Sequence, residues 1–342
     1  MIVVRCRYSS QTLQCAKQDD GILWCPMPVT ETDQSINQSN ALPGMPDFRE
    51  QLSERSSYPT DSHFSDVGGY QMHYIDEGRG RPVLMIHGNP TWSFYYRDLV
   101  KALSVGYRAI APDHIGCGLS EKPANLEYNL DLRIEQLVKF VKNLNLTDIH
   151  LLVHDWGGAI GLGAALQDLD RYRSVTFFNT AIFPPPFFPL RIRVCRTPLL
   201  GKLALQGCNL FARAAVKMAS ENPGGLAKDA KFGMLAPYDS WANRRAIYEF
   251  VKDIPTKATH PTWRRLEAIE ESTTLLKDIP VKLIWGMKDW CFRPECMDRI
   301  KELVPHAEVC EMQFAGHYVV EDEPEKVLHE VKTFLKQIDS RS

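Results

Sequence analysis

The sequence predicts an α/β protein, with a mostly parallel central sheet, helices on both faces and one inserted helical segment. From about residue 48, short apolar runs typical of buried strands alternate with longer runs typical of helices. Between residues 182 and 261 this alternation stops, and only helical patterns and a proline run remain. Because strands and helices in alternation form a parallel sheet, we expect ligands to bind at the carboxyl ends of the strands.

The elements follow in order along the chain. Apolar runs predict strands at residues 63–64, 69–76, 83–87, 107–111, 149–153, 174–178, 281–285 and 307–312. An amphipathic pattern predicts a helix over residues 129–145, and small residues predict a closely packed helix over 157–166. A third helix, 324–338, begins with a proline and closes the chain.

Four segments result from this pattern. Residues 1–45 are polar, have no apolar periodicity, and are predicted to be a disordered tail. Residues 46–181 and 262–342 form the two parts of the sheet domain. Residues 182–261 are predicted to be a helical cap, which we expect to fold over the strand ends.

The composition excludes several classes of protein. The 342 residues hold 40 Lys and Arg against 42 Asp and Glu, a net charge of -2, which suggests neither a nucleic-acid partner nor an anionic membrane. No apolar run is long enough for membrane insertion. The nine cysteines are odd in number and have no paired CxxC spacing, which favours a reducing, cytoplasmic location. The sequence leaves the oligomeric state open.

Asp155 occupies the most informative position in the sequence. It follows the predicted strand 149–153 directly and precedes Gly157 and Gly158 and the small-residue helix. A tight strand-to-helix turn of this kind is a nucleophile elbow, which usually carries a serine at its centre. A carboxylate there attacks carbon directly and forms an ester. The alternative is an ordinary helix N-cap, which does not explain the residues that follow.

Hydrolysis of such an ester needs a base, and His317 follows the last predicted strand. Gly316 would let its loop turn the imidazole inward. Asp289 follows the strand 281–285 and would orient that base. The chain order of nucleophile, acid and histidine is that of the α/β hydrolases.

Other positions for the acid are weaker. The end of the preceding strand holds Asn179, with no carboxylate near it. Glu295 and Asp298 lie further along the chain than Asp289, and we prefer Asp289 because it follows the strand end more closely.

Two side chains beside the predicted nucleophile carry hydrogen-bond donors: the N–H₂ group of one and the indole N–H of the other. The loop 87–90 follows a strand and, with the residue after the nucleophile, supplies the backbone N–H groups of an oxyanion hole. The Asn89 amide and the Trp156 indole would then both point into the pocket. Each alone has a structural explanation, but together beside Asp155 they favour a site for a departing anion.

The sequence resembles the haloalkane dehalogenases of the α/β-hydrolase superfamily over about residues 70–335. The resemblance rests on His87-Gly88-Asn89-Pro90-Thr91-Trp92, Asp113-His114-Ile115-Gly116-Cys117-Gly118-Leu119-Ser120, His154-Asp155-Trp156-Gly157-Gly158 and Gly316-His317-Tyr318. It implies displacement of halide by Asp155, with the halide held by Asn89 and Trp156. Water activated by His317, itself oriented by Asp289, would then cleave the ester and release an alcohol.

This placement of the acid, with an Asn/Trp halide pair, resembles the third dehalogenase subfamily. The implied partners are a small apolar substrate and water, without cofactor or metal. Three alternatives stay open. The similar β-lactone decarboxylases of olefin biosynthesis use the same aspartate. Epoxide hydrolases pair their nucleophilic aspartate with two cap tyrosines, for which Tyr238 and Tyr248 are candidates. A hydrolase-like binding protein would keep only the fold.

Overall fold

The computed structural model of the chain describes residues 4–8, 11–17, 23–24, 48–185, 190–197 and 199–341. It divides into two units, Met1–Asn40 and Ala41–Ser342. The first contains three strands that pair antiparallel in the order β1 (Val4–Tyr8), β2 (Gln11–Lys17) and β3 (Leu23–Trp24). The sequence predicted no strands here. The rest of the predicted tail, residues 1–45, lies outside the described residues, and its disorder stays a prediction.

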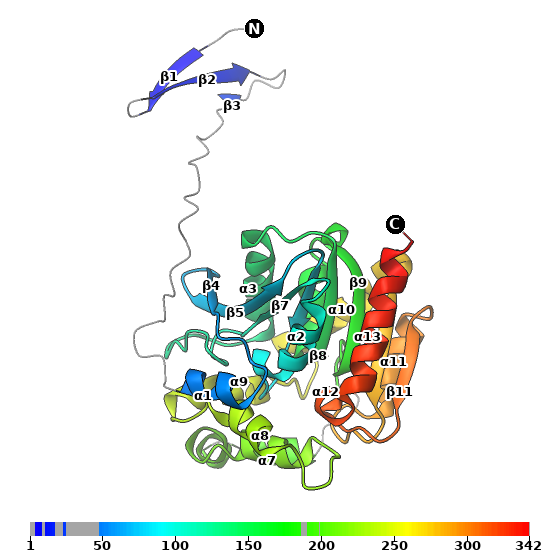
Figure 1. Cartoon of the computed structure of the whole chain (residues 1–342). Helices are drawn as coiled ribbons and strands as arrows, with labels where there is room; N and C mark the ends of the chain where they lie inside the picture. The colour runs from blue at the N-terminus through cyan, green and yellow to red at the C-terminus, as the bar shows by residue number, and fades with distance from the viewer. Residues whose placement is uncertain are drawn as a thin grey trace. The chain divides into compact units, whose positions relative to one another are not determined.

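The second unit is built on one eight-stranded sheet with the order β11-β10-β9-β8-β6-β7-β5-β4 (Figure 1). Strand β5 runs antiparallel to its neighbours β4 and β7, and every other pair is parallel. The strands are β4 (His63–Asp66), β5 (Gln71–Gly78), β6 (Pro82–Ile86), β7 (Arg108–Pro112), β8 (Ile149–Asp155), β9 (Tyr172–Thr180), β10 (Val281–Gly286) and β11 (Glu308–Met312). Each lies within two residues of its predicted position, and the predicted fold class is confirmed.

Helices cover both faces of the sheet, and alternate strand residues feed two cores. Leu84 and Ile86 of β6 belong to one core, and Val83 and Met85 to the other. The first core includes α3 (Leu130–Asn143), α4 (Trp156–Ala165), α10 (Pro261–Glu271), η5 (Ser272–Asp278) and α11 (Pro294–Leu303). The second includes α1 (Phe48–Arg55), η1 (Ser93–Tyr96), α2 (Arg97–Leu103), α12 (Val319–Asp322) and α13 (Pro324–Asp339). The short helix η2 (Leu169–Arg171) leads into β9.

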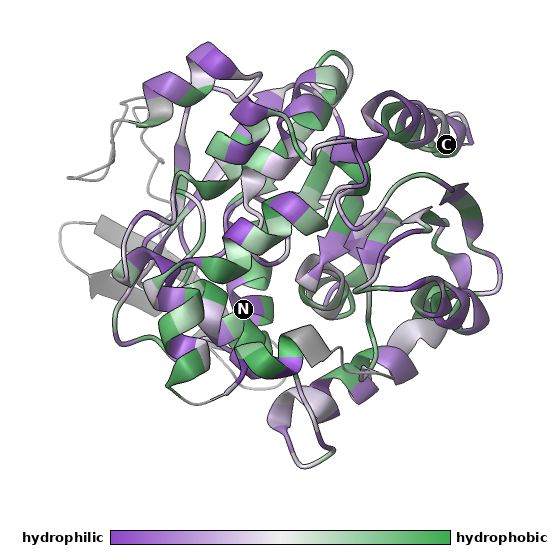
Figure 2. Cartoon of the chain, turned by 90° about the horizontal axis from the view of Figure 1, so that it is seen from below, coloured by the Kyte–Doolittle hydropathy of each residue, from purple (hydrophilic) through white to green (hydrophobic). Residues whose placement is uncertain are grey.

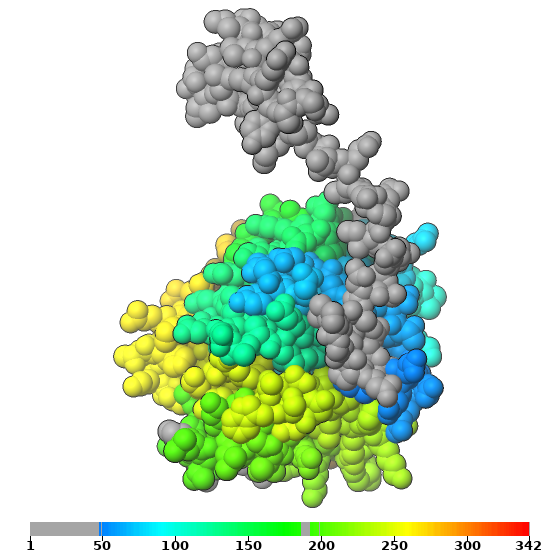
Figure 3. Space-filling model, turned by 90° about the vertical axis from the view of Figure 1, so that its left-hand side faces the viewer, coloured from blue at the N-terminus to red at the C-terminus, as the bar shows by residue number. Residues whose placement is uncertain are grey.

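The described residues between β9 and α10 form helices and no strand, and we call this segment the helical insertion. Its helices are α5 (Leu190–Cys195), α6 (Leu200–Lys202), the π-helical turn η3 (Leu203–Gly207), α7 (Leu210–Met218), α8 (Lys228–Leu235), η4 (Ala242–Arg244) and α9 (Arg245–Asp253). Figure 3 shows them, in green to yellow, as a band of surface along the lower side of this unit. The Trp92 indole donates to the Gly233 carbonyl of α8 at 3.0 Å, so the insertion is joined to the sheet domain.

Candidate functional site

Strand β8 ends in a tight turn at Asp155, and α4 begins at the next residue. Asp155 has φ 55° and ψ −128°, a strained combination for a residue with a side chain. The second and third residues of α4 must be glycines, because their surroundings leave no room for a side chain. A Cβ on Gly157 would lie 2.1 Å from the Ile86 carbonyl oxygen, and one on Gly158 would lie 1.9 Å from Thr180 Oγ1. The turn therefore has the geometry of a nucleophile elbow.

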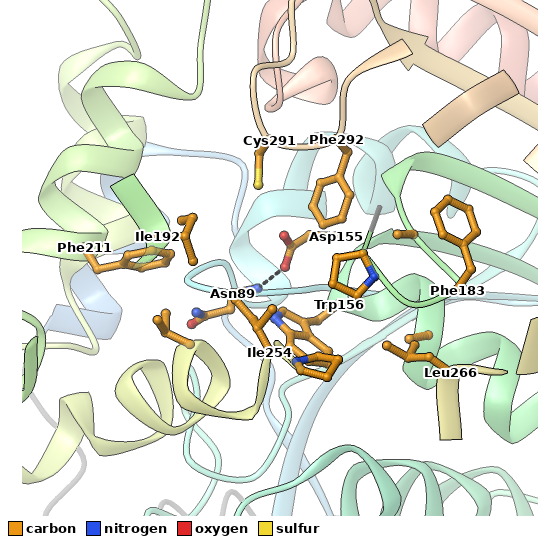
Figure 4. A pocket seen from close by; sticks show the side chains of 15 residues that line it. Asn89, Asp155, Trp156, Phe183, Ile192, Phe211, Ile254, Leu266, Cys291 and Phe292 are labelled. Carbon is orange, nitrogen blue, oxygen red and sulfur yellow. Dashed lines mark hydrogen bonds between the residues drawn. The ribbon is translucent and has the colours of Figure 1, made fainter. Parts of the chain in front are cut away.

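The Asp155 carboxylate is almost completely buried at the carboxyl edge of the sheet. The backbone N–H of Asn89 donates to its Oδ1 at 2.6 Å (Figure 4). Burial raises the pKa of Asp155 above its ordinary value, although the charge of His317 and hydrogen bonds from the backbone N–H groups of Asn89 and Trp156 oppose this. The carboxylate is thus positioned by the donors that the sequence assigned to an oxyanion hole.

His317 and Asp289 lie beside Asp155, as predicted from their places after β11 and β10. His317 Nδ1 lies 2.8 Å from Asp289 Oδ2, and His317 Nε2 lies 3.6 Å from Asp155 Oδ2. Burial alone would lower the pKa of His317, but the charge and hydrogen bond of Asp289, with the charge of Asp155, outweigh it and raise that pKa. The imidazole therefore lies between the two carboxylates, with Nδ1 facing Asp289 and Nε2 facing Asp155.

Asn179, at the end of β9, has a role in the site that the sequence did not indicate. Its Nδ2 donates to Asp289 Oδ2 at 3.0 Å, and its Oδ1 accepts from the Gly286 N–H at 2.8 Å. No carboxylate lies near Asn179 along the chain, but β9 and β10 are neighbours and bring Asn179 beside Asp289. With the Cys291 N–H, which donates to Asp289 Oδ1 at 2.6 Å, Asn179 holds the acid in place.

The two rejected candidates for the acid lie elsewhere. Glu295 and Asp298 are exposed on α11. Glu295 faces Arg293 at 3.4 Å. Within the described residues, Asp289 is the carboxylate that contacts His317 Nδ1.

The side chains of Asn89 and Trp156 line an apolar cavity of about 110 Å³ together with Asp155 (Figure 4). Asn89 Nδ2 makes only a long contact of 3.4 Å with the Ile247 carbonyl oxygen. The indole ring of Trp156 packs against Phe250, with 5.6 Å between ring centroids. The other lining residues are mostly apolar: Ala159, Ala181, Phe183, Pro185, Ile192, Phe211, Val251, Ile254, Pro255, Leu266, Cys291 and Phe292. An amide and an indole in such surroundings can hold an anion without competition from water.

A second cavity, of about 580 Å³, is lined by the same carboxylate. It shares Asn89, Asp155, Ile192, Phe211 and Cys291 with the first and adds His317. Most of its remaining wall comes from the helical insertion, between Val194 and Ala219. The site therefore has two apolar arms that meet at Asp155.

Neither Tyr238 nor Tyr248 is among the described residues that line these cavities. The hydroxyl of Tyr238 is buried and lies 3.4 Å from the Thr91 carbonyl oxygen. In the same described part of the chain, no group of three or more His, Cys, Asp or Glu side chains could hold a metal ion. No described helix is both long and apolar enough to cross a membrane.

Comparison with known proteins extends these observations. Residues 81–194 match the family of the alpha/beta hydrolase fold. The chain is 38% identical over 288 residues to a cis-3-alkyl-4-alkyloxetan-2-one decarboxylase of Shewanella oneidensis, covering 82% of this chain and 90% of that protein. It is 35% identical over 273 residues to haloalkane dehalogenase 2 of Mycobacterium tuberculosis, covering 79% and 93%.

A solved structure gives the same result for the fold. The haloalkane dehalogenase DatA from Agrobacterium tumefaciens superposes with a TM-score of 0.73 at 26% identity, over 81% of this chain and 97% of that one. Since it shares 35% identity with the Mycobacterium dehalogenase over 79% of its own length, and is similarly related to the decarboxylase, this chain belongs to the haloalkane dehalogenase family of α/β hydrolases.

Proposed function

We propose that the protein is an enzyme that hydrolyses haloalkanes to an alcohol and a halide through an ester on Asp155. One observation carries this proposal: Asp155 Oδ1 is held by the Asn89 N–H, while Oδ2 lies beside His317 at the meeting point of two apolar cavities. In the first step Oδ2 attacks the carbon that bears the halogen, the carbon–halogen bond breaks, and the halide leaves with the bonding electrons. Asn89 Nδ2 and the Trp156 indole N–H would stabilise it.

The second step releases the alcohol. His317 removes a proton from water, and the resulting hydroxide attacks the carbonyl carbon of the Asp155 ester. The backbone N–H groups of Asn89 and Trp156 stabilise the oxyanion that forms. When this intermediate collapses, the alkyl–oxygen group leaves as alcohol with the proton from His317. Asp155 is left as a carboxylic acid and becomes a carboxylate again when it loses its proton to solvent. Asp289 holds His317 in the tautomer that this step needs.

The substrate in this proposal is small or slender, apolar and uncharged, as the lining of the two cavities requires. We place the reaction in the cytoplasm. The six cysteines within the described part of the sheet domain and helical insertion are all free thiols, as a reducing compartment favours.

The test is halide release. Purified protein is incubated with 1,2-dibromoethane and a series of bromoalkanes, and bromide is measured against the Asp155→Ala variant. Trp156→Phe removes the indole donor but keeps an aromatic ring beside Phe250, and it should slow bromide release by about 10²–10³-fold while the melting temperature changes little. No bromide from any substrate would contradict the proposal.

A second candidate function is decarboxylation of a β-lactone, favoured by the larger cavity and by the 38% identity to the Shewanella decarboxylase. Asp155 would attack the ring carbon bonded to the lactone oxygen, and the ring carboxylate would leave. Loss of carbon dioxide then supplies the electrons of the new carbon–carbon double bond, and the bond to Asp155 breaks. Conversion of a synthetic dialkyl β-lactone to an alkene and carbon dioxide, with no bromide released in the first test, would assign this function instead.

A further inference from the structure

We propose that the helical insertion docks on an anionic lipid surface, at the opening of the larger cavity. The feature that suggests this is a group of exposed hydrophobic side chains. Within the described part of the chain, seven of the ten large hydrophobic side chains that are exposed belong to the insertion. We call these seven the insertion patch: Val194, Leu199, Leu200, Leu203, Leu210, Met218 and Trp241. Their exposure ranges from 38% for Met218 to 84% for Leu199.

The insertion patch is continuous with the larger cavity. Val194, Leu200, Leu210 and Met218 are exposed and also line that cavity, so they stand at its opening. Figure 2 views the molecule from the side on which α7 and α8 lie in Figure 1, and hydrophobic turns lie there beside hydrophilic ones. Among the described residues, the rim and the wall of this cavity are mostly apolar from the surface to Asp155.

Trp241 belongs to the same surface although it lies further along the chain. A Cβ on Gly207 would lie 3.0 Å from Leu203 Cδ1 and 3.3 Å from the Trp241 ring. Gln206 Nε2 donates to the Trp241 carbonyl oxygen at 3.0 Å, which fixes that loop beside η3. Leucines with an exposed tryptophan are typical of helices that bury one face in the headgroup region of a bilayer.

The positive charge of the insertion indicates that the surface it binds is anionic lipid. Residues 182–220 contain six Lys and Arg and no Asp or Glu. Arg193, Lys202, Arg213 and Lys217 are exposed, and none of them forms an ion pair with a described carboxylate. Unpaired cations around an apolar patch attract phospholipid headgroups, at about fivefold in affinity for each charge close to the surface.

Docking would let apolar molecules dissolved in the bilayer reach the larger cavity without crossing water. This consequence rests on the proposed function, because it assumes that an apolar substrate reacts at Asp155. The docking itself does not, since it depends only on the insertion patch and on the basic residues around it.

The test is sedimentation of the full chain with vesicles, without substrate. Vesicles of phosphatidylcholine with one third phosphatidylglycerol should bind the protein at low salt, whereas phosphatidylcholine alone should bind it at least about tenfold more weakly. Binding should fall as salt shortens the screening length from about 10 Å at 0.1 M to about 3 Å at 1 M. Absence of binding to anionic vesicles at low salt would overturn the proposal.

Matched variants make the test specific. Lys202→Glu with Lys217→Glu should weaken binding by about tenfold or more, whereas Lys301→Glu with Lys336→Glu, the same change in charge at exposed sites of α11 and α13, should not. Leu199→Asp with Leu203→Asp should also weaken binding. Its control is Val105→Asp with Leu275→Asp, because Val105 and Leu275 are exposed but lie outside the insertion. If the variants and their controls weaken vesicle binding equally, the insertion is not the surface that binds lipid.

Two further outcomes keep the proposals apart. If patch variants change the oligomeric state by light scattering and the wild type ignores vesicles, the patch is an interface between proteins and lipid docking is wrong. Bromide release from a water-soluble bromoalkane should be the same for the patch variants and the wild type. Loss of vesicle binding with normal bromide release, or the reverse, therefore shows which proposal fails.

Discussion

His317 is placed to act on the ester rather than on the first displacement. Its Nε2 lies 3.6 Å from Asp155 Oδ2, so a water bound to Nε2 would lie beside the ester that this carboxylate forms. Replacement of His317 by phenylalanine should leave the displacement step and abolish hydrolysis. We therefore expect the His317→Phe variant to gain the mass of one alkyl group on Asp155, measured by intact mass and peptide mapping. An accepted substrate that leaves no adduct would rule out this role.

The pH dependence of ester hydrolysis should follow His317. The base must be neutral, and the charge and hydrogen bond of Asp289 raise the pKa of His317, so the rate should rise with pH through a midpoint set by that pKa. Asp289→Asn removes the main charge that raises this pKa and should move the midpoint to lower pH, besides slowing the reaction. Glu295→Gln, which changes an exposed carboxylate, is the control and should leave the midpoint where it is. The midpoint of each protein is measured from single-turnover rates of ester hydrolysis over a range of pH.

The contact between Asn179 and Asp289 suggests that the acid can be moved to the neighbouring strand. The two side chains are 3.0 Å apart, and both lie at the strand ends that face His317. Asp289→Asn should lower activity by about 10²–10⁴-fold, and adding Asn179→Asp should recover part of the loss. Asn179→Asp alone puts two carboxylates together and should lower activity. If the double variant is no better than Asp289→Asn, Asn179 cannot carry the acid.

The sequence predicted Asp155, Asp289 and His317 because each follows a strand, and the structure brings these three side chains together. It did not predict the contact of Asn179 with Asp289. That contact joins residues 110 positions apart, and its geometry depends on the pairing of β9 with β10. Chain position alone shows which strand end a residue occupies, but not which side chain it meets there.

At the scale of elements, the junction of β8 and α4 has the least free space. Gly157→Ala would place a Cβ 2.1 Å from the Ile86 carbonyl oxygen on the neighbouring strand, and backbone cannot move aside cheaply. We expect a loss of about 2 kcal/mol or more in the free energy of unfolding, with loss of activity. Gly106→Ala is the matched control, because nothing lies within 4 Å of its added Cβ. Urea denaturation measures the free energy of unfolding of both variants. Equal values for the two would contradict the packing argument.

The elements themselves were largely predictable. The central strands β6, β8 and β10 are buried on both faces, so each is a nearly continuous apolar run in the sequence. The helical insertion was predicted as helical, but its division into α5, α6 and the π-helical turn η3 was not. Short helices of this kind depend on tertiary contacts, which periodicity does not record.

At the scale of the whole molecule, the unit Ala41–Ser342 contains both cores of the sheet domain. A chain that starts at residue 46 should therefore fold, keep its melting temperature and release bromide at the wild-type rate. Calorimetry and the bromide assay on the shortened chain measure this. Loss of folding or activity would show that residues 1–45 contribute to the domain.

The net charge of -2 is a property of the whole molecule that conceals a local one. Composition argued against an anionic membrane partner, yet residues 182–220 carry six Lys and Arg and no Asp or Glu, and acidic residues elsewhere cancel their charge. Fields near a surface fall off within about 10 Å at ordinary salt, so the local charge decides what docks there. A charge count over the full sequence could not have shown this.

The two arms of the site are unequal, about 580 Å³ against about 110 Å³, and both end at Asp155. A chain lying across both arms would present one of its interior carbons to the carboxylate, and the smaller arm would limit how many carbons lie beyond it. The site would then act as a ruler that sorts positional isomers. Among bromoalkanes of one length, the position of the bromine along the chain would matter more than the length itself.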